Sequence, residues 1–468
     1  MQIKTGKGPV SLMMVMAIWS LSLAVDLPGL AVTPIEGKLH TIFHDVTDFK
    51  IQLLTVLPNL VIIPFVLLSG KLSETRHKLL IIILGIILYA LSGLLSIFSG
   101  SLTILIWLSC LLGAGCGLIL PFSTGLIADV FSGSYRTKQM GIVSAIGNIA
   151  LVAATFAVGF LASISWHLPF IVYMIPLISL FLVPWLKKIP KNDLIDGATP
   201  ETVDGTQAPQ QTAQPATTGT TANTSEAAPT AAQPAPTVSQ ATQPAPSTQA
   251  DATAQVDVDG FSYANQKVVG GFYLGRTIWL MIAYCFFEFV TTLQTYYLPN
   301  LMPDYHMSVD DVSIVTSIYY FAMFAIGIFV TAVLNVFKKW TFIVSTAVIV
   351  IGFVIYLTSK SLPMFIVAAC LVGFGNGQTQ PIFYTKATEI VNNGAKSTLA
   401  LAFLQAANYI GISIVPVIVN LGMFLFKNHT TLFPFVIGTV LSAIALIIIC
   451  IRSRHFVFGI HKQYYVDP

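Results

Sequence analysis

Twelve apolar stretches, each long enough to cross a lipid bilayer, leave this chain few folds to choose from. The hydrocarbon layer of a membrane requires about 20 mostly apolar residues per helix. Backbone N–H and C=O groups cannot stay unbonded in lipid, so each stretch is predicted to be a helix. The stretches run Val10–Thr33, Phe49–Gly70, Lys78–Phe98, Leu102–Val130, Gln139–Ser163, Leu168–Trp185, Thr277–Leu298, Val312–Phe337, Trp340–Leu357, Leu362–Val391, Thr398–Leu425 and Leu432–Ile451.

The composition agrees with a membrane protein. Of the 468 residues, 55% are hydrophobic and only 9% are charged, with a mean hydropathy of +0.79. Soluble domains carry about 25% charged residues. The net charge of +3 and the lack of a basic run argue against a nucleic-acid partner. The five cysteines show neither metal-ligand spacing nor a disulfide framework, so neither a metal nor another cofactor is expected.

The distribution of positive charge predicts the orientation in the membrane. With the N-terminus inside, 19 of the 23 Lys and Arg residues, Lys386 among them, fall on the cytoplasmic side. Lys4, Lys7 and the segment Ser22–Ala24 resemble a signal peptide with its cleavage site. The strength of the charge bias argues against cleavage, so the first stretch is predicted to be retained. We expect a multi-pass protein of the plasma membrane with both termini cytoplasmic.

One segment differs from the rest of the chain in composition. Ile195–Asp259 is built of Ala, Thr, Pro and Gln with scattered acids, and no Lys or Arg lies between Lys191 and Lys267. Too few apolar side chains are present to offset the entropy of ordering, so disorder is predicted. The expected domains are an N-terminal six-helix half (1–190), a disordered cytoplasmic linker (191–272) and a C-terminal six-helix half with a short cytoplasmic tail (273–468). The linker is either a flexible tether or a docking segment.

The two sets of six stretches repeat each other at a constant offset of 260 residues. The matched pairs are Gly113 and Gly373, Gly115 and Gly375, Gly117 and Gly377, Pro121 and Pro381, Asp129 and Glu389, Arg136 and Lys396, and Asn148 and Asn408. The repeat is parallel, because the fourth and tenth stretches enter the membrane from the same side. Parallel six-helix repeats belong to a transporter architecture with the solute site between the halves near mid-membrane.

The chain resembles the major facilitator superfamily and, within it, the bacterial drug–proton antiporter-like exporters. The resemblance is carried by the two Gly-x-Gly-x-Gly-x-x-x-Pro spans, by the loop Gly70–Lys78 and by Ser165–Tyr173, which leads into the sixth span. It implies an all-α membrane protein of twelve transmembrane helices in two parallel-repeat halves. It also implies a monomer that moves a small drug-like or amphipathic solute across the bilayer by alternating access, coupled to protons.

Two departures from the exporter pattern keep other functions open. Ser109 and Cys110 stand where these exporters carry an Arg, and Ala154–Thr155 stands where they carry Gly-Pro. Proton-coupled import of a small metabolite is therefore an alternative, as is a non-transporting sensor with the same fold. The spans contain no nucleophile–base or metal-ligand cluster, so the chain is not expected to be an enzyme.

Two carboxylates lie well inside predicted spans, Asp26 and Glu288. A charged Asp at a helix centre costs about 2.5–3.5 kcal/mol, so such residues usually face a cavity. Glu288 follows Arg276 by 12 residues, or about 18 Å of helix, which is near mid-membrane. Both residues are predicted to act in proton coupling or cation recognition. The alternative is a neutral carboxyl group that forms hydrogen bonds between helices.

Amide side chains in the spans are candidates for the substrate pocket, because they offer both donors and acceptors to a polar solute. These candidates are Asn148, Gln294, Asn376, Gln378, Gln405 and Asn408. The alternative is hydrogen bonding between helices, worth about 0.6 kcal/mol per contact.

Charges at the inner helix ends form a candidate cytoplasmic gate of ion pairs, with solvated helix-end charge as the alternative. They are Glu74, Arg76, Asp129, Arg136, Glu389 and Lys396. The Gly and Pro residues of the fourth and tenth spans are interpreted as packing and hinge positions rather than ligand sites, because small residues let helix backbones approach closely. They are Gly113, Gly115, Gly117, Pro121, Gly373, Gly375, Gly377 and Pro381.

The predicted topology can be tested by labelling. Single cysteines placed in the linker and in Ser99–Ser101, on a background without the five native cysteines, are expected to react oppositely with a membrane-impermeant thiol reagent added to intact cells. The loop should be labelled and the linker protected, because the charge bias holds the linker inside. Labelling of the linker from outside would contradict the topology.

Overall fold

The computed structural model describes residues 2–6, 8–24, 27–28, 31–32, 39, 48–74, 78–187, 267–392, 394–460 and 464. In the first half, a short hairpin of β1 (Gln2–Lys4) and β2 (Pro9–Ser11) precedes the helices. The helices are α1 (Leu12–Ser20) with the 3₁₀ turn η1 (Leu21–Ala24), α3 (Asp48–Leu72), α4 (Lys78–Ile97), α5 (Leu102–Val130), α6 (Gly133–Ile164), and η3 (Leu168–Met174) continued by α7 (Leu177–Leu186).

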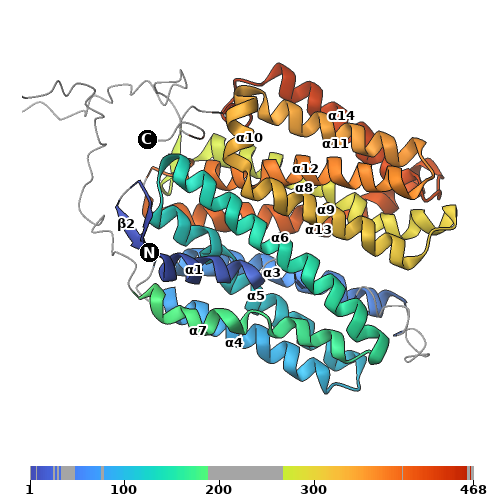
Figure 1. The fold of residues 1–468 in the computed structure, drawn as a ribbon, viewed down its shortest axis with the longest axis horizontal. Helices are drawn as coiled ribbons and strands as arrows, with labels where there is room; N and C mark the ends of the chain where they lie inside the picture. The colour runs from blue at the N-terminus through green and yellow to red at the C-terminus, as the bar shows by residue number, and fades with distance from the viewer. Residues whose placement is uncertain are drawn as a thin grey trace, which may run out of the picture. The chain divides into compact units, whose positions relative to one another are not determined.

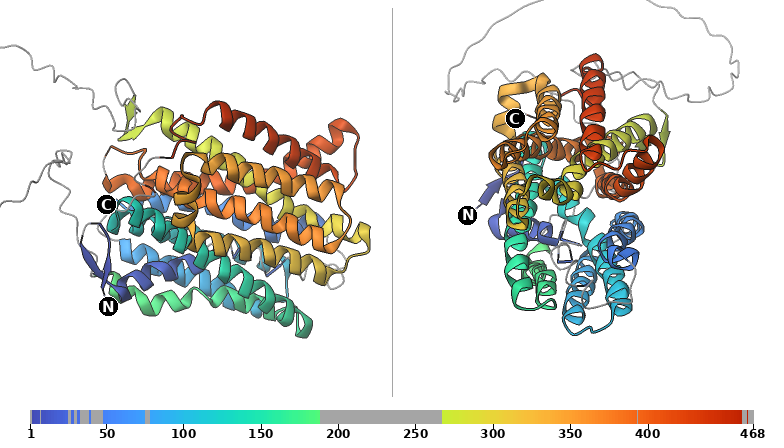
Figure 2. Two further views of the ribbon diagram at one scale, coloured as in Figure 1. Left: turned by 45° about the horizontal axis from the view of Figure 1, so that its top comes forward. Right: turned by 90° about the vertical axis from the view of Figure 1, so that its right-hand side faces the viewer.

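The second half opens with a hairpin of β3 (Val268–Val269) and β4 (Phe272–Tyr273). Its helices are α8 (Leu274–Leu301) with η4 (Met302–Tyr305), α9 (Val309–Ile328), α10 (Val330–Phe337), η5 (Lys338–Trp340), α11 (Thr341–Thr358), α12 (Leu362–Ala387), η6 (Gly394–Lys396) with α13 (Ser397–Phe426), and α14 (Phe433–Ile451). The helices of the two halves form separate groups when viewed along the bundle (Figure 2, right).

The fold predicted from the apolar stretches is confirmed. Among the described residues, 11 helical stretches are long and apolar enough to cross a membrane, and the shorter apolar stretch Leu12–Ala24 corresponds to the first predicted span. Two details differ. The predicted span Val312–Phe337 is divided at Phe329 into α9 and α10. The sixth span begins as a 3₁₀ helix, η3, before α7.

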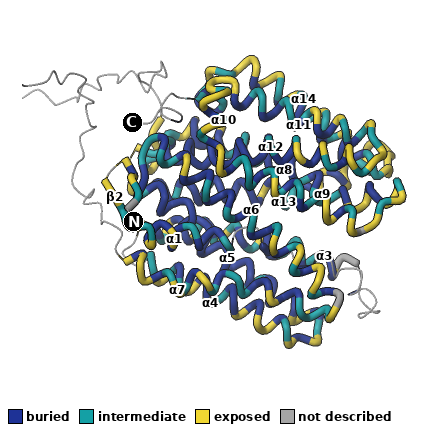
Figure 3. Tube along the Cα trace, in the orientation of Figure 1, coloured by how far each residue is buried: buried dark blue, intermediate teal, exposed yellow. Residues whose placement is uncertain are grey.

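Both chain ends lie at the same end of the bundle (Figure 1). At this end α1 begins, α7 stops, α8 begins and α14 stops, and we call it the terminal end. Large apolar side chains such as Phe160, Phe181 and Phe424 are exposed on outer helix faces. Exposed positions follow the outer faces and the helix ends in Figure 3. Such an apolar exterior matches the hydrocarbon of a bilayer.

Glycines hold the interior helices of each half close together, and they do so in the same pattern twice. A Cβ atom on Gly113 would lie 2.5 Å from the Pro58 oxygen in α3, and one on Gly373 would lie 2.5 Å from the Tyr319 oxygen in α9.

The middle glycine of each triplet faces a different neighbour. A Cβ on Gly115 would lie 2.6 Å from the Tyr89 backbone nitrogen in α4, and one on Gly375 would lie 2.6 Å from the Ser345 oxygen in α11. Gly117 and Gly377 again face α3 and α9, with Pro121 and Pro381 one turn further along α5 and α12. These helices therefore contact both neighbours through backbone atoms.

Residues 195–259, predicted to be disordered, lie outside the described residues. The far end of the predicted linker differs from the expectation. Residues 267–272 fall within or beside the β3–β4 hairpin, which is attached to the second half. The Tyr273 N–H donates to the Ile390 oxygen over 2.9 Å, and the Asn392 N–H donates to the Gly271 oxygen over 3.0 Å.

The glycine packing yields a test of stability. Gly115→Ala is expected to destabilise the protein by about 1–3 kcal/mol, because the added methyl group overlaps backbone atoms of α4. Thermal unfolding of purified protein in detergent would measure the loss. Gly159→Ala is the matched control, since nothing lies within 4 Å of a Cβ at that position of α6. Equal stability of the two variants would contradict close α4–α5 packing.

Candidate functional site

A cavity of about 160 Å³ lies between the two halves. Its first-half lining comes from Pro28 and from α3 and α6, and its second-half lining from α8, α9, α12 and α13. The lining side chains are Pro28, Thr55, Asn59, Asn148, Leu151, Glu288, Thr292, Thr295, Tyr296, Tyr319, Tyr320, Met323, Asn376, Gln380, Asn408, Tyr409 and Ile412. Hydroxyl, amide and aromatic groups surround one carboxylate, so the cavity suits a solute with both polar and apolar parts.

Glu288 contributes the carboxyl group of this lining. It lies midway along α8, and only 7% of its surface is exposed. Tyr319 and Tyr320, with ring centroids 5.1 Å apart, line the same cavity from α9. The other predicted carboxylate, Asp26, lies outside the described residues.

Asn148 and Asn408, which the repeat relates to each other, both line the cavity. Asn148 is on α6 in the first half, and Asn408 is on α13 in the second half. Within the described part of the chain, the Asn148 Nδ2 and Asn408 Oδ1 atoms are buried and have no hydrogen-bond partner. An unbonded buried amide atom costs about 1–3 kcal/mol, so these atoms are ready to bind a polar solute.

A hydrogen-bonded network forms the α12 wall of the cavity. The Asn376 Nδ2 atom donates to the Tyr319 hydroxyl over 3.0 Å and to the Thr291 hydroxyl over 3.3 Å. The Ser144 hydroxyl of α6 donates to Gln380 Oε1, which joins the two halves at the cavity wall. These bonds fix the amide orientations before a solute arrives.

Three of the predicted amides do not line this cavity. The Gln378 Oε1 atom accepts a hydrogen bond of 2.8 Å from Ser345, so this side chain faces α11 instead. Gln294 and Gln405 are buried at other positions of α8 and α13. Thr55, Asn59 and Tyr409 line the cavity although they are absent from the predicted set.

The missed residues carry a weak signal in the sequence. Thr55 and Asn59 are polar residues one turn apart in an otherwise apolar span, which places them on one helix face. That spacing could have identified α3 as a cavity helix.

On the terminal side of the cavity, the halves meet through small residues. A Cβ on Gly125 of α5 would lie 2.5 Å from the Thr398 hydroxyl of α13. Gly70 faces Ala402, and Gly141 faces Gly327, again across the two halves. These contacts close the cavity on the terminal side.

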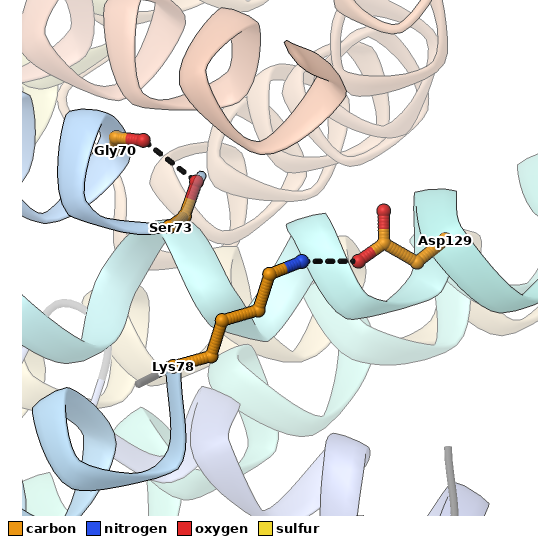
Figure 4. A network of polar contacts seen from close by, with 4 residues as sticks. All are labelled: Gly70, Ser73, Lys78 and Asp129. Carbon is orange, nitrogen blue, oxygen red and sulfur yellow. Dashed lines mark hydrogen bonds and ion pairs between the residues drawn. The ribbon is translucent and has the colours of Figure 1, made fainter. Parts of the chain in front are cut away.

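The candidate gate residues lie around this contact, but their partners differ from those expected. The Lys78 ammonium group lies 3.0 Å from the Asp129 carboxylate, within the first half (Figure 4). Lys78 is the last residue of the Gly70–Lys78 loop that carries part of the family resemblance. Beside this pair, the Ser73 hydroxyl donates to the Gly70 oxygen over 2.6 Å. Glu74 is exposed at the end of the same turn.

Arg136 joins the halves through a hydroxyl group. Its Nη1 atom donates to the Thr388 hydroxyl over 2.7 Å, and its Nε atom donates to the Phe131 oxygen over 2.9 Å. Lys396, its repeat partner, donates over 2.6 Å to the Gly270 oxygen of the β3–β4 hairpin. Arg76 lies outside the described residues.

The residues after α14 form a second feature that the sequence analysis missed. Lys386, the penultimate residue of α12, is fully buried, and its Nζ atom donates to the Phe456 and Gly459 oxygens over 2.5 and 2.6 Å. The Tyr464 hydroxyl donates to the Glu389 carboxylate over 2.5 Å. The described residues after α14 are therefore attached at and just beyond the end of α12, near Thr388.

The architecture and the inter-half cavity together define a multi-pass helical transporter fold. The sequence profile of the family described as the Major Facilitator Superfamily matches residues 10–246 and 280–456. The chain belongs to this superfamily, and it is a membrane transporter of that class.

Curated relatives resemble part of the chain. The quinolone resistance protein NorA of Staphylococcus aureus (strain MRSA252) is 32% identical over 114 residues, which are 24% of this chain and 29% of NorA. The multidrug transporter protein MdtP of Bacillus subtilis (strain 168) is 28% identical over 100 residues, which are 21% of this chain and 18% of MdtP. The matched region thus spans less than a third of either relative.

Solved structures share the fold over nearly the whole chain. The proton:xylose symporter XylE bound to 6-bromo-6-deoxy-D-glucose has a TM-score of 0.63 at 12% identity and covers 94% of each chain. A double tryptophan mutant of XylE has a TM-score of 0.65 at 15% identity, with 97% of each chain covered. The human organic anion transporter MFSD10 has a TM-score of 0.58 at 13% identity, covering 93% of this chain and 96% of MFSD10.

The contact at the terminal end predicts the effect of a bulky substitution there. Gly125→Leu is expected to separate the halves at this end, because a larger side chain cannot fit against Thr398. Spin labels on cysteines at the exposed positions Lys138 and Lys338, one in each half, would report longer distances.

Gly159→Leu is the control for the spin-label experiment, since it adds the same side chain at a position with open space around it. An unchanged distance distribution in folded Gly125→Leu protein would refute the role of this contact in closure.

Proposed function

We propose that this transporter exports drug-like or amphipathic compounds in exchange for protons, by alternating access. The observation that supports this most directly is the carboxylate of Glu288 in the lining of the cavity between the halves. A carboxyl group at that point can bind either a proton or a cationic group of the solute. Separation of the halves at the terminal end, with closure at the opposite end, would expose the same cavity to the other side of the membrane.

The cavity chemistry favours amphipathic solutes with aromatic or cationic parts. The rings of Tyr296, Tyr319, Tyr320 and Tyr409 offer flat apolar surfaces and hydroxyl groups. A cation held near such rings gains about 0.5–2 kcal/mol, and the Glu288 carboxylate adds direct charge complementarity. The unbonded amide atoms of Asn148 and Asn408 would bind polar groups of the solute from opposite halves.

The two partial relatives are named for quinolone resistance and multidrug transport, and these names favour export of drug-like compounds over import of a metabolite. XylE, which shares the fold, is named as a proton symporter, so import by symport is the second candidate. Both candidates use a carboxylate that alternates between charged and neutral forms.

The orientation is part of the proposal. We place the termini, the linker and the terminal end on the cytoplasmic side of the plasma membrane, on the basis of the charge bias. The closed contact at the terminal end then corresponds to a state that denies cytoplasmic access to the cavity.

Glu288→Gln is expected to abolish accumulation driven by a pH gradient. The amide keeps the shape of a protonated carboxyl group, but it cannot release a proton, so it cannot couple proton movement to the change of state. Uptake of a labelled quinolone or dye into proteoliposomes would measure the effect. Counterflow without a gradient should persist, and it serves as the check that the variant is folded.

Asp310→Asn is the matched control, because this carboxylate is exposed at the start of α9. Asp26→Asn is expected to have a smaller effect than Glu288→Gln. Unchanged gradient-driven accumulation in folded Glu288→Gln protein would remove Glu288 from the mechanism.

The direction of the pH gradient that drives accumulation distinguishes export by antiport from import by symport. For an antiporter, proteoliposomes that are acidic inside should accumulate the compound, because protons leave as the compound enters. For a symporter, vesicles that are acidic outside should accumulate it. Accumulation only under the second condition would contradict export by antiport.

A further inference from the structure

A second cavity, of about 410 Å³, lies between α8 and α14 on the outside of the second half. Its walls are almost entirely apolar, and they include Trp279, Ile282 and Phe286 of α8 and Ile444, Ala445 and Ile448 of α14. Several of these side chains, such as Trp279, Ile282 and Ile448, are about half exposed. The cavity is therefore a groove that opens toward the surrounding lipid.

The groove is separate from the central cavity. Phe287 lines the groove, and the next residue, Glu288, lines the central cavity. Successive helical residues point about 100° apart, so α8 presents different faces to the two spaces.

The charged and imidazole side chains of the lining lie at one end of the groove. Arg452 and His455, which follow the last turn of α14, line it at the terminal end. Burial, and then the charges of Arg452, Lys386 and Arg276, lower the pKa of the His455 side chain, which favours the neutral imidazole. Its Nδ1 atom accepts from the Val457 N–H over 3.4 Å, which places the ring proton on Nε2. Arg452 supplies a permanent charge and His455 supplies a neutral donor.

The end wall of the groove is held in place by the buried lysine. Val457 and Phe458 line the groove. They lie between Phe456 and Gly459, whose oxygens accept the two hydrogen bonds from Lys386. The Phe458 ring also packs edge-on against Phe342, with centroids 6.0 Å apart. The polar end of the groove is therefore part of the packed second half.

Like a membrane lipid, the groove has a charged group at one end and is apolar along the rest of its length. From Arg452 to Ile444 it follows eight residues of α14, which is about 12 Å along the helix axis. Its charged end lies at the helix ends, where headgroups are, and its apolar end points toward the membrane centre. An arginine guanidinium group matches a phosphate in charge and in hydrogen-bond geometry.

We propose that the groove between α8 and α14 binds an anionic phospholipid, with one acyl chain along Ile282 and Ile448 and the phosphate at Arg452 and His455. The proposal depends on the membrane location of the chain and not on which solute it transports. The charge of Arg452 selects an anionic headgroup over a zwitterionic one.

The test uses the full chain purified in detergent, with phosphatidylglycerol and phosphatidylcholine of identical acyl chains as probes. Phosphatidylglycerol is expected to raise the unfolding temperature in a saturable way and at lower concentration than phosphatidylcholine. Arg452→Gln should weaken the phosphatidylglycerol response about fivefold, as expected for the loss of one cationic contact near the membrane surface. Arg454→Gln is the matched control, because Arg454 is exposed and does not line the groove.

A second variant tests the acyl-chain part of the groove. Ala283→Phe fills it from α8 and should weaken the response to phosphatidylglycerol. Ala347→Phe on α11, outside the groove, should not.

Several outcomes would overturn the proposal. Equal responses to the two lipids would exclude headgroup selection. Equal losses in Arg452→Gln and Arg454→Gln would assign the effect to general surface charge. A change of oligomeric state in Ala283→Phe, with lipid binding unchanged, would show that a second copy of the chain covers the groove instead.

Discussion

Close backbone contact along α5 and α12 is the constraint on which the rest of this structure depends. In a bilayer the surrounding acyl chains are as apolar as the helix surfaces, so helices associate through close packing rather than by escape from water. Gly113, Gly115 and Gly117 bring α5 against two neighbours at once, and the second half repeats the arrangement. The space left between the two packed groups is where the central cavity lies.

The interior of the protein keeps the internal symmetry, whereas the terminal end breaks it. Asn148 and Asn408 occupy matching places in the central cavity. At the helix ends, Asp129 pairs with the lysine that begins α4, but its repeat partner Glu389 accepts a hydrogen bond from Tyr464. The residues after α14 have no counterpart after α7 among those described. A symmetric interior with unlike ends allows the two halves to have different roles at the same membrane surface.

The sequence predicts the fold well because membrane helices are recognised by length and hydropathy alone. The repeat at offset 260 also relates glycines that make equivalent close contacts, and it relates two asparagines that both line the central cavity. The spans are less predictable where helices break, as at Phe329, because Gly327 precedes the break but other glycines lie inside unbroken helices, as Gly113 does in α5.

The site is predicted only in part, because the rotation of each helix is not encoded in composition. Gln378 and Gln380 are two residues apart, so they point to nearly opposite faces of α12, and only Gln380 lines the cavity. Either could be chosen from the sequence. The partner of Lys386 is likewise unpredictable, because the groups that bind it are backbone oxygens 70 and 73 residues away.

That separation has a consequence for biogenesis. When the ribosome has just completed α12, the carbonyl groups that will surround the Lys386 ammonium group have not been made. Until they are, the lysine must keep its charge in the aqueous interface, at the end of its helix. The amine can be enclosed only after α13 and α14 have entered the membrane and residues up to Gly459 have left the ribosome. Enclosure of this lysine therefore depends on the docking of Phe456–Gly459, and nascent chains stalled before Phe456 would leave this corner of the protein hydrated.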